Sequence, residues 1–190
     1  MGIQKLIIIT APSGAGKTSI TRYLLDKYPQ LSFSISAATR TPRVGEQNGV
    51  DYYFISTEEF QNHIEQHDFV EWEMVYEGKY YGTLKTEVER IWHADRVPVL
   101  DIDVKGAIHV KKEFEHTTLC IFIEPPSVEE LKVRLEKRKT DSLESIQTRL
   151  SKAEYELSFK DQFDKIIVND NLEKACHETE AVIKEFLGWE

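Results

Sequence analysis

The sequence predicts an α/β protein with a three-layer core, in which helices cover both faces of a parallel sheet, together with an inserted lobe and a helical lid. Three observations predict this architecture. Apolar, β-branched runs alternate with helical patterns near both ends of the chain, and a glycine-containing loop joins the first run to the first helix. Residues 33–92 break the alternation with short strands. The 190 residues suffice for one domain with a sizeable core and small insertions.

The first elements follow from local patterns. Lys5–Thr10 is almost continuously apolar, which is typical of a buried parallel strand. Lys17–Tyr28 has apolar residues at helical spacing and stops before Pro29. Leu31–Ser36 alternates and is expected to be a strand, and Thr39–Gly49 is rich in Thr, Pro, Arg and Gly, so it is expected to be a loop.

The inserted lobe is expected to contain short strands and one capped helix. Tyr52–Ser56 is a short strand pattern, and Ser56 with Glu59 forms a capping box for a helix that reaches about Gln66. Two further elements are expected: a hairpin of Phe69–Tyr76 and Tyr80 onward that turns at Gly78, and a helix over Lys85–Ala94.

The alternation of strands and helices resumes in the second half of the chain. Strands are expected over Val97–Asp103, Thr118–Ile123 and Ile166–Val168. Helices are expected over Gly106–Phe114, Ser127–Lys139, Ser142–Phe159 and Leu172–Leu187. The charged stretch 127–160 resembles a mobile helical insertion. We therefore expect a core of residues 1–32, 93–126 and 161–190, a lobe of residues 33–92 and a lid of residues 127–160.

The composition excludes several classes of function. The net charge of −9 argues against nucleic acid or an anionic membrane as the main partner. The apolar runs are far shorter than the ~20 residues of a membrane span, and Met1–Lys5 leads directly into a strand, so we expect a cytoplasmic protein. Cys120 and Cys176 have no disulfide or metal spacing and are expected to be reduced structural residues.

The loop after the first strand predicts a binding site for a nucleoside triphosphate. Backbone N–H groups at a helix start attract phosphate, and small residues let the backbone wrap around it. Lys17 would reach the β- and γ-phosphates, and the Thr18 hydroxyl would hold Mg²⁺. The loop matches the template G-x-x-x-x-G-K-[ST] of P-loop NTPases except at its first position, and it consists of Ala11, Pro12, Ser13, Gly14, Ala15, Gly16, Lys17 and Thr18. This loop alone does not distinguish an ATPase, a GTPase and a kinase.

Five motifs farther along the chain resemble, in order, those of guanylate kinases. They are Ser34–Arg43, Gly49–Phe54, Phe69–Trp72, Tyr80–Thr83 and Leu100–Asp103, and the resemblance covers essentially the whole chain. The resemblance implies transfer of a phosphoryl group from ATP to GMP, and also to dGMP, with Mg²⁺. It also implies a P-loop core, a GMP-binding lobe and a lid.

The residue chemistry supports a guanine nucleotide as the acceptor. Arg40 and Arg43 are three residues apart in a proline-constrained loop, and arginine binds phosphate through two hydrogen bonds. A carboxylate facing N1–H and N2–H₂ would accept guanine and leave adenine unpaired, and Glu71 matches the family position for this role. The resemblance assigns eight residues to GMP: Ser36, Arg40, Arg43, Tyr52, Glu71, Tyr81, Thr83 and Asp103.

The resemblance also assigns residues to ATP and to catalysis. Arg138 and Arg149 match lid arginines that contact the ATP phosphates, and with Lys17 and Arg40 they form the expected catalytic set. Asp101 ends an apolar strand, where P-loop enzymes keep a carboxylate that holds Mg²⁺ through water; a helix N-cap is its alternative. The remaining residues assigned to ATP are Arg134, on the same helix face as Arg138, and Asn169 and Asp170, near the adenine.

Several alternatives stay open at this stage. The arginines, Glu71 and the charged helices could be solvated surface groups, and the acceptor could be AMP or dGMP only. Related domains also act as non-catalytic protein-binding modules, although those typically have damaged phosphate loops. The sequence departs from the family pattern at Ala11, Lys105 and Lys139. It does not decide between a monomer and a homodimer.

Overall fold

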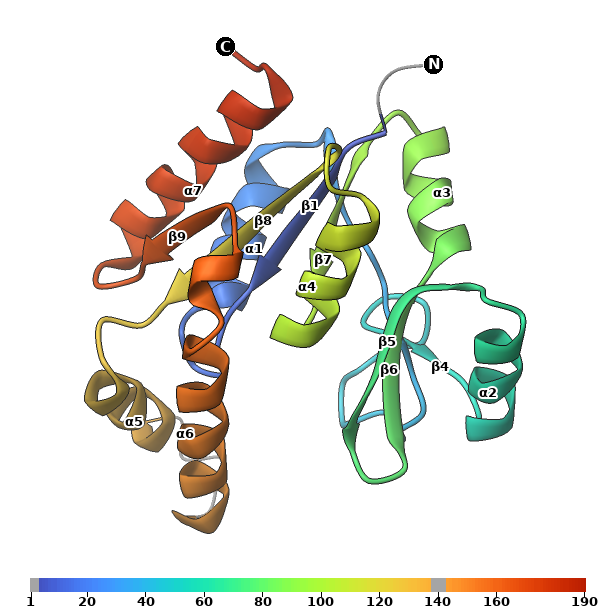
Figure 1. Cartoon of the computed structure of the whole chain (residues 1–190), viewed down its shortest axis with the longest axis horizontal. Helices are drawn as coiled ribbons and strands as arrows, with labels where there is room; N and C mark the ends of the chain where they lie inside the picture. Colours follow the sequence, from blue (N-terminus) through green and yellow to red (C-terminus); the bar gives the residue numbers. More distant parts are fainter. Residues whose placement is uncertain (1–3, 138–142) are drawn as a thin grey trace.

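A parallel sheet with helices on both faces forms the core of the computed structural model, which describes residues 4–137 and 143–190 (Figure 1). The strand order is β2-β7-β1-β8-β9, and every neighbouring pair is parallel. The strands are β1 (Leu6–Thr10), β2 (Leu31–Phe33), β7 (Val97–Asp101), β8 (Thr118–Glu124) and β9 (Lys165–Val168). Helices α1 (Lys17–Lys27) and α7 (Leu172–Leu187) cover one face, and α3 (Lys85–His93) and α4 (Val104–Glu113) cover the other. The predicted three-layer α/β core is confirmed.

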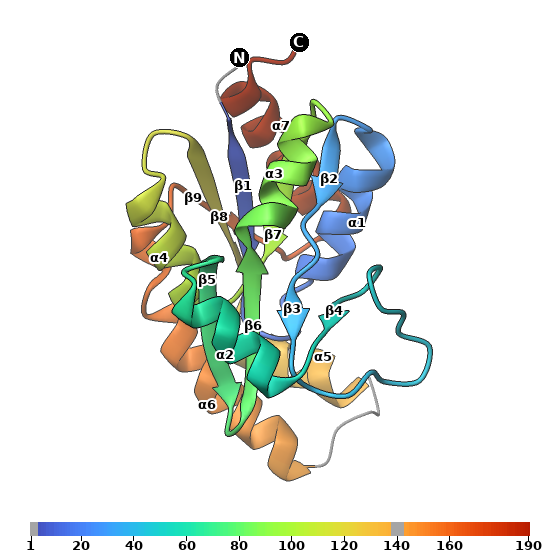
Figure 2. The ribbon, with the colours of Figure 1, turned by 90° about the vertical axis from the view of Figure 1, so that its right-hand side faces the viewer.

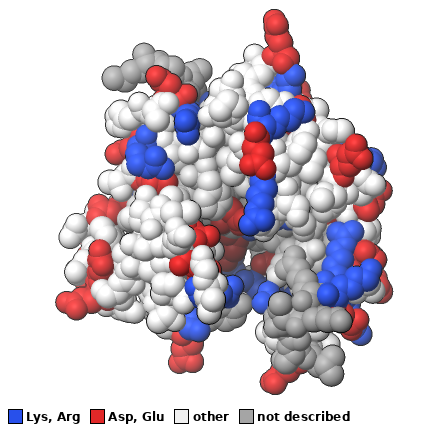
Figure 3. All heavy atoms as spheres, turned by 180° about the vertical axis from the view of Figure 1, so that it is seen from behind, with Lys and Arg blue, Asp and Glu red and all other residues white. Residues whose placement is uncertain are grey.

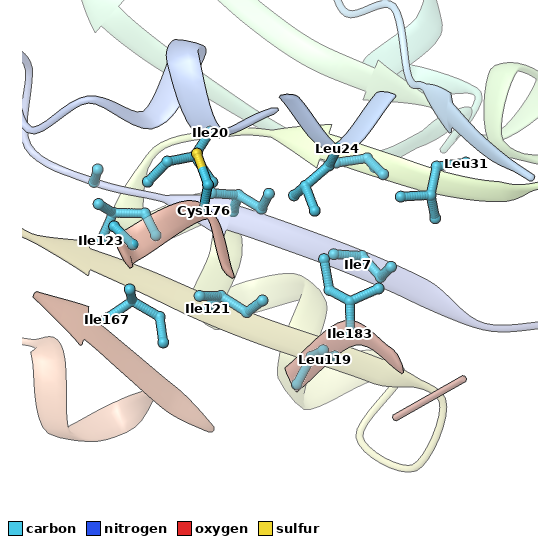
Figure 4. Packing of buried hydrophobic residues seen from close by; sticks show 14 of the residues in the cluster. Ile7, Ile20, Leu24, Leu31, Leu119, Ile121, Ile123, Ile167, Cys176 and Ile183 are labelled. Carbon is cyan, nitrogen blue, oxygen red and sulfur yellow. The ribbon is translucent and has the colours of Figure 1, made fainter. Parts of the chain in front are cut away.

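Strand β1 is buried on both faces. Ile7 and Ile9 pack with residues of α1 and α7 on one face (Figure 4), whereas Leu6 and Ile8 pack with residues of α3 and α4 on the other. All four side chains are fully buried. Because burying one such side chain contributes about 1.5–3 kcal/mol, the central strand is a rigid support for the loop that follows it.

A second, smaller sheet makes up the inserted lobe (Figure 2). Its order is β4-β3-β6-β5, and its strands are β3 (Ala37–Ala38), β4 (Tyr53–Phe54), β5 (Phe69–Tyr76) and β6 (Lys79–Leu84). Helix α2 (Thr57–Glu65) packs on this sheet through Phe60, which stacks on Phe69 with ring centroids 4.4 Å apart. The predicted cap is present, because the Glu59 N–H donates to Ser56 Oγ at 3.0 Å.

Two charged helices project from the core beyond β8. Helices α5 (Val128–Lys137) and α6 (Leu143–Leu157) pack on each other through an apolar cluster that includes Leu131, Leu135 and Ile146. A short 3-10 helix, Lys160–Gln162, then leads back to β9. The predicted end of the first helix and two of its residues, Arg138 and Lys139, lie outside the described residues.

Three element boundaries differ from the prediction. The strand expected over Leu31–Ser36 leaves the core sheet after Phe33, because the Ile35 N–H donates to Glu87 Oε1 at 3.1 Å and the chain turns toward the second sheet. The strand expected to reach Asp103 ends at Asp101, and α4 begins two residues before the expected Gly106. The Asp103 side chain is the reason, since its Oδ1 caps α4 by accepting from the Gly106 N–H at 2.9 Å.

Two further expectations concern the two cysteines and membrane-spanning helices. Cys120 and Cys176 are both buried and free, and burial raises the pKa of Cys120 to about 12, which keeps it a thiol. Within residues 4–137 and 143–190, no helix has both the length and the apolar character that a bilayer crossing requires.

Candidate functional site: a cleft between the phosphate loop and the lobe

The loop Ala11–Thr18 wraps around the start of α1. Gly14 and Gly16 have φ of 97° and 102°, a left-handed conformation that favours glycine. The only non-glycine residues with positive φ in the described chain are His67 and Asp95, so Ala11 is unstrained. The departure of Ala11 from the template therefore costs no backbone strain.

The Asn169 side chain holds this loop from the opposite side, and Arg134 supports Asn169 in turn. Asn169 Nδ2 donates to the Ala15 carbonyl at 2.7 Å, and a Cβ on Gly16 would overlap the same amide. Arg134 Nη2 donates to the Asn169 carbonyl at 3.0 Å and its Nε to Glu130 Oε1 at 3.1 Å. Asn169 and Arg134 are both expected at ATP. Asn169 contacts the loop, Arg134 contacts Asn169, and neither residue lines the cleft. Asp170 is exposed beside them and accepts from the Asn171 N–H at 2.8 Å.

Lys17 and Asp101 form an ion pair at the mouth of the loop. The register of β1 and β7 pairs Ile9 with Asp101, so the carboxylate stands beside the loop. Asp101 is not a helix cap, because Asp103 caps α4. Thr18 is exposed next to Lys17. The Thr18 hydroxyl and the Asp101 carboxylate are oxygen donors, the type that Mg²⁺ takes when it also binds substrate phosphates, so these residues fit that ion.

A cleft of about 480 Å³ separates the loop from the lobe. Figure 3, which views the molecule from behind, shows a hollow with acidic and basic atoms at its edges. Helix α6 contributes a third wall, where Arg149 Nη1 donates to Ser13 Oγ at 2.7 Å. The predicted residues on its walls are the loop members Ala11, Pro12, Ser13, Gly14, Gly16, Lys17 and Thr18, together with Ser36, Arg43, Tyr52, Glu71, Tyr81, Asp101, Asp103 and Arg149.

The two predicted phosphate-binding arginines differ in their surroundings. The guanidinium of Arg43 is exposed at the cleft and has no hydrogen bond or ion pair to any described residue. Arg40 lies behind it with its side chain only 9% exposed. Its Nη1 and Nη2 donate to the two oxygens of Glu46 at 2.6 and 2.7 Å, and its Nε donates to Tyr81 Oη at 3.1 Å. Arg40 also stacks over the Tyr52 ring at 4.9 Å.

The tyrosine pairs divide between the cleft and the lobe interior. Tyr52 and Tyr81 line the cleft, with ring centroids 6.0 Å apart. Tyr53 and Tyr80 pack in the apolar cluster of the lobe, where Tyr53 Oη also donates to Glu87 at 2.9 Å. Alternation along each strand produces this division, since neighbouring side chains point to opposite faces.

Glu71 also lines the cleft, but unlike Arg43 it is acidic and buried. Glu71 is only 6% exposed, and its Oε1 accepts from Thr83 Oγ1 at 2.7 Å. Burial raises the pKa of Glu71 to about 7, and the charge of Asp103 acts in the same direction. Thr83 is fully buried and reaches the cleft only through this bond. The pocket therefore offers one carboxylate edge to a group that donates hydrogen bonds.

Sequence reasoning missed four charged residues around this cleft. Glu46 binds Arg40, and its Oε2 also accepts from the Arg43 N–H at 2.7 Å. Glu73, Lys152 and Glu156 line the cleft. Lys152 and Glu156 lie three and seven residues after Arg149, so helical spacing could have placed them on the same face. Burial raises the pKa of Glu156, although Lys152 lies 3.6 Å away.

Comparisons with known proteins agree on one family. The family model described as guanylate kinase matches residues 3–186. The guanylate kinase of Porphyromonas gingivalis is 52% identical over 187 residues, which cover 98% of this chain and 100% of that protein. That of Bacteroides thetaiotaomicron is 51% identical over 186 residues, which cover 98% of this chain and 91% of that protein. Among solved structures, the guanylate kinase from Anaplasma phagocytophilum superimposes with a TM-score of 0.77 at 26% identity, covering 97% of this chain and 87% of that one.

Proposed function

This chain belongs to the guanylate kinase family, the ATP:GMP phosphotransferases, and we propose that it performs this transfer in the cleft between the phosphate loop and the lobe. The proposal assigns ATP to the core, GMP to the lobe of residues 33–92, and the charged helices of residues 127–160 to a lid. The observation that carries it is the pairing of two unlike walls, a phosphate loop with Lys17 on one side and Arg43 with Glu71 on the other.

The donor site lies on the core side. Lys17 and the backbone N–H groups of the loop hold the phosphates of ATP, and Arg149 of α6 adds a positive charge at Ser13. Arg138, outside the described residues, keeps its predicted role at these phosphates. Thr18 and Asp101 would hold Mg²⁺, which would neutralise charge on the triphosphate.

The acceptor site lies on the lobe side. Arg40, Arg43, Tyr52 and Tyr81 bind the phosphate of GMP, and the Ser36 hydroxyl contacts the guanine base. Glu71 accepts from N1–H and N2–H₂ of guanine, and Thr83 and Asp103 hold the far end of this pocket. No residue in this assignment addresses the ribose 2′-hydroxyl, so dGMP is an acceptor too.

The chemistry requires positioning and positive charge. A phosphate oxygen of GMP forms a bond to the γ-phosphorus of ATP, and the bond from that phosphorus to the β,γ-bridging oxygen breaks, leaving ADP. The attacking oxygen is already anionic above the second pKa of a phosphate monoester, about 6, so no side chain has to remove a proton. Lys17 and Arg149 stabilise the charge that moves between donor and acceptor.

Two alternatives make different predictions. A kinase for AMP would need an adenine reader, whereas Glu71 presents a carboxylate to the base. A protein-binding module would not need an intact loop, yet Lys17, Thr18 and Asp101 are together at the mouth of this one.

The test is a coupled assay of ADP release with ATP and Mg²⁺, using GMP, dGMP, AMP, CMP or UMP as the acceptor. We expect turnover with GMP and dGMP and at least about 10⁴-fold lower kcat/KM with AMP, because a mismatched base leaves buried polar groups unpaired. Equal turnover with all acceptors would contradict the assignment of guanine. Binding of a phosphorylated peptide without turnover would favour the protein-binding module.

A further inference from the structure

Gly106 occupies the first turn of α4, directly behind Glu71. It lies within the helix, is buried, and does not have a positive φ. Backbone conformation therefore does not require glycine at this position. Glycine within a helix costs roughly 0.5–1 kcal/mol relative to alanine, so its presence here has to be explained by what surrounds it.

The surroundings leave no room for a side chain. A Cβ on Gly106 would lie 2.7 Å from Glu71 Oε2, 3.3 Å from Glu71 Cδ and 3.4 Å from Asp103 Oδ1. The first of these distances is shorter than carbon and oxygen atoms tolerate. The Glu71 carboxylate thus fills the space that a methyl group on α4 would occupy.

The same carboxylate is fixed on its other side. Thr83 Oγ1 donates to Glu71 Oε1 at 2.7 Å from β6, and Asp103 Oδ1 holds the Gly106 N–H at 2.9 Å. The Glu71 carboxylate is therefore held between a hydroxyl on one strand and bare backbone on one helix. Because Glu71 has a flexible side chain, a new methyl group would shift its carboxylate away from α4 and out of the position from which it faces the cleft.

A displaced carboxylate has somewhere to go. A second groove, of about 690 Å³, runs between β5 and α4, and Glu71 and Gly106 both line it. Lys105 and His109, on the exposed side of α4, line it as well. A methyl group on Gly106 would turn Glu71 toward this groove, where Lys105 attracts it, so the protein would fold while its carboxylate faced away from the base.

We propose that Gly106 is a positioning residue that determines guanine specificity, because its missing side chain lets Glu71 lie against α4 and face the base. This inference rests on the proposed role of Glu71 as the guanine reader. According to this inference, the backbone of α4 helps to select the base by leaving room for the Glu71 carboxylate, in addition to the hydrogen bond that Glu71 accepts from Thr83.

The test is Gly106→Ala, measured by steady-state kinetics together with urea unfolding. Because a misplacement of about 1 Å can cost about 10²-fold, we expect KM for GMP to rise at least about tenfold. The KM for ATP should be unchanged, and kcat at saturating GMP should fall less than kcat/KM. The unfolding midpoint should stay close to that of the natural protein, since the gain from a helical alanine offsets part of the cost of the lost Thr83 bond. An unchanged KM for GMP would overturn the proposal.

A double-mutant cycle with Glu71→Ala separates this inference from the proposed function. In the Glu71→Ala background no carboxylate remains to be displaced, so Gly106→Ala should leave KM for GMP unchanged. An equal rise in both backgrounds would mean that α4 itself is disturbed, and the proposal would fail. A normal KM for GMP in Glu71→Ala alone would overturn the reader assignment instead.

The cycle also decides the outcome if Gly106→Ala does not fold. Folding restored in Gly106→Ala/Glu71→Ala would support the steric conflict, whereas a double variant that also fails to fold would overturn it. Lys105→Ala, an exposed residue of the same helical turn, controls for general changes in α4 and should leave KM for GMP within about twofold.

Discussion

Glu46 binds both terminal nitrogens of Arg40 and the backbone N–H of Arg43, so one carboxylate connects the two predicted phosphate-binding arginines. Arg40 in turn lowers the pKa of Glu46 to about 2, and the carboxylate stays ionised throughout the neutral range. The loop that presents Arg43 therefore takes its shape from an internal ion pair.

We predict that Glu46→Gln raises KM for GMP about tenfold, because loss of the charge-assisted bonds loosens both arginines. Steady-state kinetics at fixed ATP would measure this. Asp51→Asn is the matched control, since Asp51 accepts from the Gln47 N–H in the same loop without touching either arginine. A fall in KM would mean that Glu46 competes with the phosphate.

Lys17→Ala is expected to lower kcat by at least about 10²-fold, because it removes a positive charge from the transferring phosphoryl group. Its effect on the unfolding free energy should stay within about 1 kcal/mol, since the ion pair with Asp101 is partly exposed. Arg22→Ala, an exposed cation of the same helix, should keep full activity. Activity that survives in Lys17→Ala would show that the loop is not catalytic.

The raised pKa of Glu71, about 7, predicts a pH dependence of acceptor binding. A protonated carboxyl loses its capacity as a double acceptor, so KM for GMP should rise as the pH falls from 8 to 6. Bound guanine should lower the pKa of Glu71, because its N–H donors favour the ionised form of the carboxylate. The groups facing Glu71 are Thr83, Asp103 and Glu73, and the two carboxylates raise its pKa further.

The control for this pH profile is Glu71→Gln, which keeps the shape of the side chain but does not titrate. Because the phosphate of GMP also titrates near pH 6, the informative quantity is the ratio of the two KM values. We expect Glu71→Gln to bind GMP much more weakly than the natural protein at pH 8 and the difference to narrow at pH 6. A ratio that is constant with pH would show that Glu71 does not titrate in this range.

A stability prediction concerns Glu180 of α7, which joins α1 to α7. It accepts from Tyr23 Oη at 2.6 Å, from Lys27 Nζ at 2.7 Å and from Tyr28 Oη, and these bonds lower its pKa to about 2. Glu180→Gln should lower the unfolding free energy at pH 7 by about 1–2 kcal/mol, because the bonds lose their charge.

The pH dependence of this effect has a definite sign. The folded pKa of Glu180 lies below its ordinary value of 4.5, so the stabilisation is present above 4.5 and is lost as the pH falls toward 2. Urea unfolding at pH 7, 5 and 4 should show the difference between the natural protein and Glu180→Gln decreasing. Glu185→Gln, an exposed carboxylate on the same helix, is the control. An equal loss in both variants would contradict the prediction.

The sequence predicted the elements and the phosphate loop well, because both depend on local patterns. Lys5–Thr10 is apolar throughout and is a central strand, and Ser56 with Glu59 marks a helix start that is present. The turn after Phe33 could not be predicted, since it depends on Glu87, which lies 52 residues away from Ile35. Likewise, Asp101 and Asp103 look equivalent as strand-ending acids, and only the start of α4 distinguishes the cap from the partner of Lys17.

The candidate site was harder to predict, because its contacts join distant residues. Glu46 is close to Arg40 in sequence, yet nothing in its loop indicates a carboxylate between two arginines. Most of the residues that the resemblance to guanylate kinases assigns line the cleft, whereas Asn169 and Arg134 lie behind the loop. A motif match gives the family's residue types, and the packing determines which of them line the cleft.

The turn at Ile35 has a consequence for how acceptor choice can change. In the described chain, the lobe joins the core at two crossings, one near Ile35 and one at the step from β6 into α3, and Glu87 of α3 bonds to the first of them. Both ends of the lobe thus meet at one corner of the parallel sheet. A different lobe grafted at that corner would leave the register of the core strands intact, but it would also need a matching α4, because Glu71 of the lobe packs against Gly106 of that helix.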